Sequence, residues 1–122
     1  MRVMVFVKAT EASEKGFQPS AWTDAMMEAM GRYNDALREA GILRMAEGLT
    51  PSSQGKRIAI DGDSRTVIDG PFAQPRELVA GFWIWEVKDL AEAIAWAKRC
   101  PNPMPEPSEI EIRPFYDLAE VQ

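Results

Sequence analysis

The first strand-like segment of the chain is apolar on both of its sides. It runs from Arg2 to Ala9 with the sequence RVMVFVKA, and the apolar positions alternate as Val3, Val5 and Val7 against Met4 and Phe6. Successive side chains of a strand point to opposite faces of a sheet. Both faces of this strand must therefore be covered, one by helices and the other by a second layer.

The next segments predict a long helix and a hairpin. A helix is expected from the N-cap Ser20 to Gly41, because apolar residues recur there at intervals of three and four. Its stripe consists of Trp22, Met26, Met30, Tyr33, Leu37 and Ala40. Residues 42–51 follow as a short strand or an extended segment. Residues 57–60 and 65–68 flank the turn sequence DGDS, which is typical of a hairpin.

The second half of the chain predicts a strand, a helix and a last strand. In the strand at 80–87, Phe82 and Ile84 lie on one face and Trp83 and Trp85 on the other. Asp89 opens a helix that ends at Cys100-Pro101, with Leu90, Ile94 and Ala97 as its expected buried stripe. Residues 109–115 form the last strand, and residues 115–122 a short tail.

This order, β-α-β-β-β-α-β, predicts one α+β domain over residues 1–122, a sandwich of the ferredoxin-like kind. In that fold the helices cover one face of the sheet and leave the other bare. Because the strands here are apolar on both faces, we expect a second copy of the chain to cover the bare face. The pattern therefore predicts a two-fold homodimer joined through the sheet.

Composition excludes several classes of function. The net charge is −5 and the basic residues are not clustered, which disfavours binding to nucleic acid and to anionic membranes. The chain has one cysteine, no signal-like segment and no long apolar run, so a cytoplasmic location is expected. It has no histidine, which removes the usual general base near neutral pH and the commonest metal ligand.

Asp69, in the turn DGPF, is the candidate catalytic residue. In one interpretation it is a carboxylate at the mouth of a cleft, whose proton affinity would rise if Phe72, Phe82 and tryptophans surrounded it. In the other it is turn chemistry, because an Asp before Gly-Pro accepts hydrogen bonds from nearby backbone N–H groups. The two interpretations explain the residue type equally well.

Three further charged residues are candidates for the ligand-binding cleft, alongside Asp69, Phe72 and Phe82. Glu47 either faces Asp69 as a second carboxylate or pairs with an arginine, and the ion pair is favoured. Arg113 either clamps a substrate carboxylate or forms a structural ion pair, which is again favoured. Lys8 is a substrate clamp or a solvated strand end.

The remaining polar residues favour structural roles. Tyr33 is expected to pack with its hydroxyl bonded, Trp83 and Trp85 to contact a helix or a dimer partner, and Cys100 to be buried and inert. The segment DGD at 61–63 is not a calcium loop, since Phe72 stands where the twelfth-position Glu would be needed. We expect no cofactor and no metal site.

Several motifs together resemble one known family. The segment from VIDGPF at residue 67 to the end of the second helix, followed by IEIRPF, is similar to the DGPF-domain branch of the YciI-like (YCII-related) proteins. AEGLTP at 46–51 and the amino-terminal MRVMVFVKA also match. The resemblance implies a dimeric α/β barrel of ferredoxin-like halves, with a cleft near the dimer interface.

The resemblance implies less about activity. The wider group includes enzymes that are proposed to use a His-Asp pair, and a chain without histidine cannot use that mechanism. Members of the branch are also associated with extracytoplasmic-function sigma factors. Our first hypothesis is a dimer whose cleft around the DGPF turn binds, or binds and transforms, a small organic molecule. The alternatives are a regulatory module acting through a protein partner such as that sigma factor, or a scaffold without a ligand.

Overall fold

The computed structural model describes residues 1–117 and contains one four-stranded antiparallel sheet and one separate hairpin. In spatial order the sheet consists of β2 (Leu43–Gly48), β5 (Val79–Glu86), β1 (Arg2–Lys8) and β6 (Ile110–Pro114). All three neighbouring pairs are antiparallel. With helices between β1 and β2 and between β5 and β6, this is a ferredoxin-like arrangement, as the sequence predicted.

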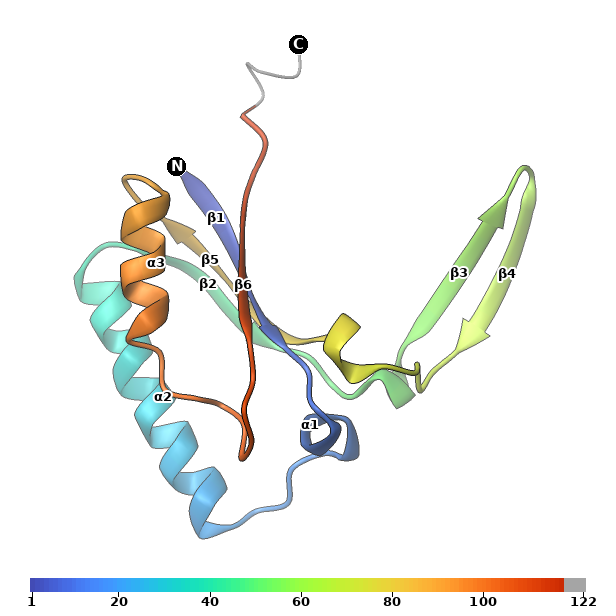
Figure 1. Cartoon of the computed structure of the whole chain (residues 1–122), viewed down its shortest axis with the longest axis horizontal. Coiled ribbons are helices and arrows are strands. Elements are labelled where there is room, and N and C mark those ends of the chain that lie inside the picture. The colour runs from blue at the N-terminus through green and yellow to red at the C-terminus, as the bar shows by residue number, and fades with distance from the viewer. Residues whose placement is uncertain (118–122) are drawn as a thin grey trace.

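The helices α2 (Ala21–Glu39) and α3 (Leu90–Lys98) lie on the same side of this sheet (Figure 1). As predicted, Ser20 caps α2: its hydroxyl accepts a hydrogen bond from the backbone N–H of Thr23, and Thr23 reciprocates. After α2 the chain turns at Gly41, whose φ of 75° favours glycine. Asp89 caps α3 by accepting from the backbone N–H of Glu92 at 2.9 Å.

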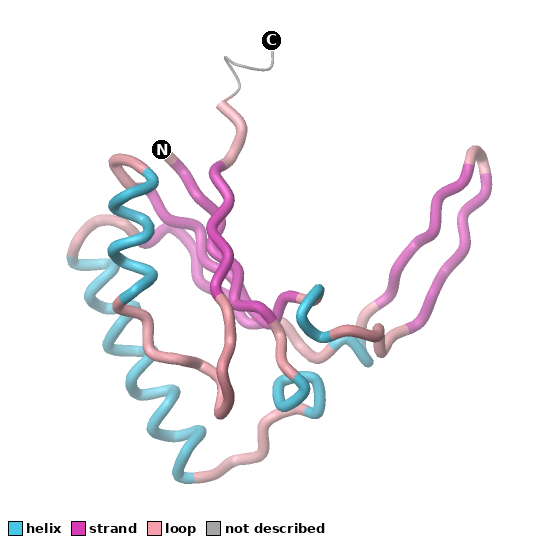
Figure 2. Tube along the Cα trace, viewed as in Figure 1, coloured by secondary structure: helices cyan, strands magenta, loops and turns pink. Residues whose placement is uncertain are grey.

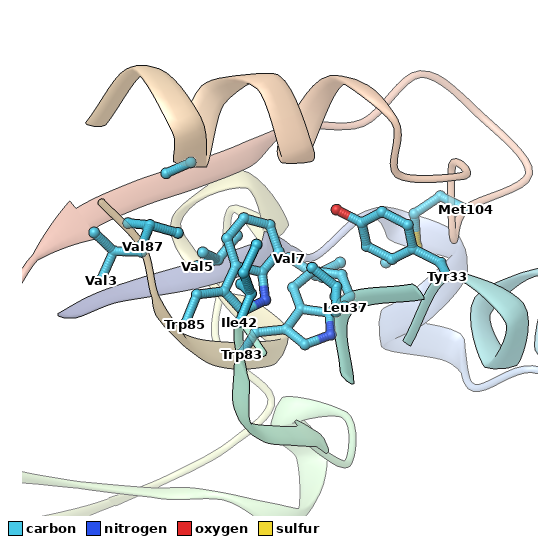
Figure 3. Packing of buried hydrophobic residues seen from close by; sticks show 11 residues of the cluster. Val3, Val5, Val7, Tyr33, Leu37, Ile42, Trp83, Trp85, Val87 and Met104 are labelled. Carbon is cyan, nitrogen blue, oxygen red and sulfur yellow. The ribbon is translucent and has the colours of Figure 1, made fainter. Parts of the chain in front are cut away.

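The hydrophobic core fills the space between these helices and the sheet (Figure 3). Strand alternation turns the valines of β1 and the tryptophans of β5 toward the helices, in register as Val3 with Trp85 and Val5 with Trp83. Tyr33 and Leu37 of α2 pack against them. Both expected contacts, tryptophans against a helix and Tyr33 in the packing, are confirmed.

The opposite face of the sheet is also apolar. The register pairs Met4 with Ile84 and Phe6 with Phe82, so these four side chains point away from α2 and α3. All four are only half-buried, although they sit on the two central strands of the sheet. Met45 of β2 is paired with Ile84 on the same face and is exposed. The predicted two-sided apolar sheet is therefore present.

The predicted hairpin is formed by β3 (Lys56–Asp61) and β4 (Ser64–Asp69), but it does not join the main sheet. It projects from the body of the molecule as a separate ribbon, and every residue of both strands is exposed (Figures 1 and 2). The two strands pair only with each other, so the predicted hairpin is an insertion between β2 and β5. For residues 42–51 the sequence allowed either a short strand or an extended segment. They contain the edge strand β2.

Three short helical segments were not predicted. They are α1 (Glu11–Lys15) and the 3-10 turns η1 (Ser52–Gln54) and η2 (Pro75–Glu77). Thr10 and Ser13 cap α1 reciprocally, so the spacing of two hydroxyl residues in TEAS was the available signal. Of the predicted tail, residues 118–122 lie outside the described part of the chain.

The predicted buried stripe of α3 was wrong for Leu90 and Ile94 and is confirmed for Ala97, which packs against the core. Leu90 and Ile94 are 42% and 43% exposed, whereas Ala93 is completely buried. A small side chain at Ala93 lets the helix backbone come close to the sheet, and Trp96 and Ala97 then pack against the core. The larger aliphatic residues are consequently turned outward.

No helix within residues 1–117 is long and apolar enough to cross a membrane.

Candidate functional site

A pocket of about 330 Å³ lies between α2 and the helix-covered face of the sheet, and we call it the α2 pocket. Its walls come from α2, β1, β2 and β5, the segment before α2 and the loop before β6. The lining residues are Val7, Phe17, Met26, Met30, Asn34, Ala46, Glu47, Gly48, Ala80, Gly81, Phe82, Trp83, Pro103 and Met104. The volume lies in the range of small-molecule sites.

The pocket exists because the floor of the sheet is made of small residues at this end. Gly48 and Gly81 face each other in the β2–β5 register, and Ala46 lies opposite Trp83. Met26 and Met30, on the N-terminal half of α2, therefore face the open pocket, and Met30 also packs against the core. They belong to the apolar stripe expected on this helix, of which only Tyr33 and Leu37 are buried.

One polar side chain marks the wall of this pocket. The Trp83 indole Nε1 donates a hydrogen bond to the Asn34 side-chain oxygen at 2.8 Å. Asn34 is half-buried on α2, and Trp83 is buried on β5. The Tyr33 ring packs edge-on against Trp83 with the centroids 5.9 Å apart, which holds the indole in place.

Tyr33 itself is engaged in the core and has no role in the pocket. Its hydroxyl donates to the backbone oxygen of Trp96 at 2.6 Å, as its predicted packing role required. Burial raises the pKa of Tyr33 well above its usual range, and the nearby Cys100 adds to the effect. The hydroxyl therefore stays protonated at neutral pH.

Glu47 and Phe82 line the α2 pocket, but the alternation of their strands turns their side chains the other way. Glu47 is paired with Phe82, whereas their neighbours Ala46 and Trp83 form the pair that faces the helices. The two residues thus meet the pocket along the backbone. Their side chains lie on the sheet face opposite α2 and α3, which we call the uncovered face. There Phe82 stands beside Phe6.

Lys8 and Arg113 also belong to the uncovered face, where both approach Glu111. The Lys8 ammonium lies 3.9 Å from one Glu111 oxygen, and an Arg113 guanidinium nitrogen lies 3.3 Å from the other. An ion pair was the favoured interpretation for Arg113, although Glu111 was not the partner considered. Lys8 also borders a separate hollow of about 580 Å³ that carries side chains of both charge signs, including Arg76 and Glu106.

Asp69 lies at the base of the hairpin, away from the α2 pocket. Its carboxylate is 2.7 Å from the Lys56 ammonium, and the two side chains are 73% and 60% exposed. The Phe72 ring lies under the Arg57 guanidinium, 3.9 Å from its centre, and also on the hairpin side. The six residues predicted for one cleft are therefore divided between the uncovered sheet face and the base of the hairpin.

The DGPF turn is held by a chain of backbone contacts. The Gly70 N–H donates to the Gly55 oxygen at 3.0 Å, and the Phe72 N–H donates to the Ser52 hydroxyl at 3.0 Å. Ser52 in turn donates its hydroxyl and its backbone N–H to the Glu14 carboxylate of α1. The Gly70–Pro71 peptide is cis. The turn thus ties the hairpin to α1 and η1.

These arrangements support binding better than acid–base chemistry. Within residues 1–117, Glu47 is the one ionisable residue along the α2 pocket, and its side chain points away. No group of three or more Cys, Asp or Glu residues in the same range is placed to hold a metal ion. The methionines and Asn34 form the wall instead. Sequence reasoning did not propose them as ligand contacts, because the residues that they face are distant in the sequence.

Comparison with known proteins gives a consistent picture of relatedness. A family model of the YCII-related domain matches residues 1–118. An uncharacterized protein of Rhizobium meliloti (strain 1021) is 30% identical over 100 residues, which cover 79% of this chain and 81% of that protein. The residues that the family model matches include the four strands of the main sheet and the inserted hairpin.

Proposed function

The chain belongs to the YCII-related family, and on that basis and the geometry of the α2 pocket we propose that it binds a small, largely apolar organic molecule. The observation that carries the proposal is a pocket of about 330 Å³ whose side chains are nearly all apolar, with one amide in its wall. Ligand sites commonly combine such an apolar lining with a few polar groups that orient the ligand. Here Asn34 is that group.

Binding without turnover is the version that the contacts support. The exposed Asp69 is paired with Lys56 and is not one of the residues that line the α2 pocket. General acid–base catalysis requires a titratable group within hydrogen-bond reach of the bound molecule. The α2 pocket offers none from its side chains, so the bound molecule is held and released unchanged.

A ligand screen with a pocket-filling variant tests the proposal. We expect small neutral aromatic compounds to raise the melting temperature of the wild-type protein and to shift the NMR signals of residues around Met30 and Trp83. Gly48→Leu would place a side chain on the floor of the pocket, where a Cβ meets no atom within 4 Å, and should abolish the shifts. Gly31→Leu, on the exposed side of α2, is the control. Binding that survives Gly48→Leu contradicts the location.

The uncovered face of the sheet supports a second part of the proposal, a two-fold homodimer. Met4, Phe6, Phe82 and Ile84 form a contiguous apolar patch there. Lys8, Glu47, Glu111 and Arg113 surround it with both charge signs, and a two-fold axis can bring such a rim into register with its own copy. A second chain over this face would bury the patch as the helices bury the other side.

Analytical ultracentrifugation distinguishes the dimer from a monomer. Phe6→Lys puts a charge at the centre of the patch and should convert the dimer to a monomer. Ile94→Lys changes an exposed apolar residue of α3, on the opposite side of the sheet, and should leave the dimer intact. A wild-type protein that sediments as a monomer at micromolar concentration refutes the dimer.

The hairpin favours a different candidate function, in which the chain acts through a protein partner. Ile58, Ile60 and Val67 are exposed on β3 and β4, and Ile58 and Val67 are directly paired on one face. An extracytoplasmic-function sigma factor is the partner class that the resemblance implies. Titration of such a purified sigma factor against wild type and Ile58→Ser tests it: binding to wild type that Ile58→Ser weakens supports this function, and no binding excludes it.

A further inference from the structure

We propose that the α2 pocket selects neutral aromatic molecules that carry one hydrogen-bond acceptor, and that the Asn34 side-chain amide donates to this acceptor. The inference rests on the proposed function of the same pocket and adds the class of ligand. It follows from the orientation of one amide, from the lack of a charged side chain in the pocket wall, and from the chemistry of the apolar residues beside it.

The orientation of the Asn34 amide is set by Trp83. An indole Nε1–H is a donor with no acceptor capacity, so the atom that it meets at 2.8 Å must be the amide oxygen. The Asn34 Nδ2 group, with two N–H bonds, is therefore turned away from Trp83. No residue between 1 and 117 accepts a hydrogen bond from it, while Asn34 forms part of the pocket wall. Because Asn34 is one of the residues that line the pocket, the proposal places this unpaired donor toward the space that a ligand would fill.

A ligand without an acceptor would leave this donor unpaired. Water can satisfy Nδ2 in the empty pocket, but a hydrocarbon that displaces the water cannot. A buried donor without a partner weakens binding, and sites built to hydrogen-bond a group discriminate against analogues that lack it. A carbonyl oxygen placed next to Nδ2 restores the lost hydrogen bond, so the pocket should distinguish the two ligands.

Charged ligands are disfavoured because the pocket supplies no opposite charge. Among residues 1–117 no Lys or Arg lines it, and the side chain of Glu47 points to the other face of the sheet. An anion or cation that enters the apolar lining would lose its hydration without compensation. The net charge of −5 adds a long-range repulsion for anions.

The apolar lining favours an aromatic ring. Met26, Met30 and Met104 contribute flexible thioether side chains, which adapt to ligand shape and make favourable sulfur–aromatic contacts. Trp83 presents an aromatic surface next to the Asn34 amide. A ring among the methionines with its acceptor turned toward Asn34 uses both parts of the site. Aryl ketones and esters have this combination.

Three probes of nearly equal size separate these requirements. Acetophenone carries a carbonyl acceptor, α-methylstyrene replaces the carbonyl with an isosteric C=CH₂ group, and benzoate carries a charge. Affinities would be measured by NMR titration of the full chain, with the side-chain signals of Asn34 and the indole signal of Trp83 as site markers. We expect acetophenone to bind about five- to tenfold more tightly than α-methylstyrene, as one hydrogen bond allows, and benzoate to bind more weakly than either.

Asn34→Asp provides the matched variant, because its carboxylate still accepts from Trp83 but has no N–H to donate. Asn34→Leu removes both functions and keeps a similar volume. Each variant therefore serves as a control for structural disturbance caused by the other. In both we expect the preference for acetophenone over α-methylstyrene to disappear, with melting curves showing that each variant is folded.

The outcomes separate the two levels of the proposal. If acetophenone and α-methylstyrene bind equally in the wild type, or if the preference survives in Asn34→Asp and Asn34→Leu, the inference is wrong while the proposed binding function stands. If benzoate binds most tightly, the expected exclusion of charge is wrong. If no probe shifts the site markers and a wider screen also finds no ligand, the proposed function itself fails, and the inference fails with it.

Discussion

The carbonyl oxygen of Ser52 occupies the place where a side chain on Gly70 would begin. A Cβ built on Gly70 would lie 1.7 Å from this oxygen, far inside van der Waals contact. The glycine of the DGPF turn is therefore required by a close approach between two backbone segments. This contact, together with the hydrogen bond from the Phe72 N–H to the Ser52 hydroxyl, sets where the hairpin leaves the body of the domain.

We expect Gly70→Ala to destabilise this junction. The added methyl group cannot be accommodated by a side-chain rotation, because the opposing atoms belong to the Ser52 backbone. Overpacking of this kind typically costs about 1–3 kcal/mol. Urea denaturation measures the global loss, and hydrogen exchange of residues 52–72 measures a local one.

Gly31→Ala is the control for this change. Gly31 lies inside α2, and a Cβ there meets no atom within 4 Å. The same chemical substitution should stabilise the protein by about 0.5–1 kcal/mol, because alanine favours the helix. If Gly70→Ala were as stable and as protected from exchange as the wild type, the contact with Ser52 would not be the reason for glycine at this position.

The Asp69–Lys56 ion pair is expected to contribute little to stability. Both side chains are largely in solvent, and exposed pairs are worth about 0–1 kcal/mol. Asp69→Asn and Lys56→Gln should therefore each lower the free energy of unfolding by less than about 1 kcal/mol. Neither should change ligand affinity in the α2 pocket. A large loss of binding in Asp69→Asn alone would instead support the predicted functional role of this carboxylate.

The main sheet could be predicted from sequence because its signals are local. Alternation in residues 2–9 and 80–87 identifies two strands and assigns their faces without knowledge of their partners. The position of the hairpin is different in kind. It depends on the contact between Ser52 and Gly70, which no periodic pattern encodes. The predicted cleft grouped Asp69 with Glu47 because turn and strand end were assumed to meet.

The α2 pocket was missed for a related reason. The stripe on α2 identifies residues that share one face of the helix, but their burial depends on what stands opposite. Leu37 lies in the core cluster, whereas Met26 and Met30 line the pocket together with the small residues Ala46, Gly48 and Gly81. Likewise, the Asn34–Trp83 hydrogen bond joins residues 49 positions apart. Sequence patterns identify Trp83 as buried but cannot pair it with Asn34.

Trp83→Phe should destabilise the fold more than Trp85→Phe. Both tryptophans are buried on the same face of β5, so the volume removed is the same. Trp83→Phe also breaks the hydrogen bond to Asn34, while the Trp85 Nε1 has no hydrogen-bond partner among the described residues. One net hydrogen bond is worth about 1 kcal/mol, and this is the expected difference between the variants. Urea denaturation of both proteins measures it, and equal losses would contradict the assigned hydrogen bond.

Cys100 is expected to make the stability depend on pH in the alkaline range. Burial raises the pKa of its thiol from about 9 to about 12. Well below pH 9 the thiol is protonated in both the folded and the unfolded chain, so its contribution is constant. Between pH 9 and 12 the unfolded chain loses the proton while the folded chain keeps it, and stability falls as the pH rises.

Cys100→Ala isolates this contribution, because it removes the titrating group and leaves the buried Tyr33 in place. The pKa of Tyr33 is raised in the same direction, so the wild type and the variant should both lose stability above pH 10. The variant should lose it less steeply between pH 9 and 10, where the thiol of the unfolded chain loses its proton ahead of Tyr33. Guanidinium denaturation at half-unit pH steps gives the two slopes. Identical slopes would mean that the thiol titrates freely in the folded protein, and rapid alkylation of Cys100 at pH 10 would confirm that result.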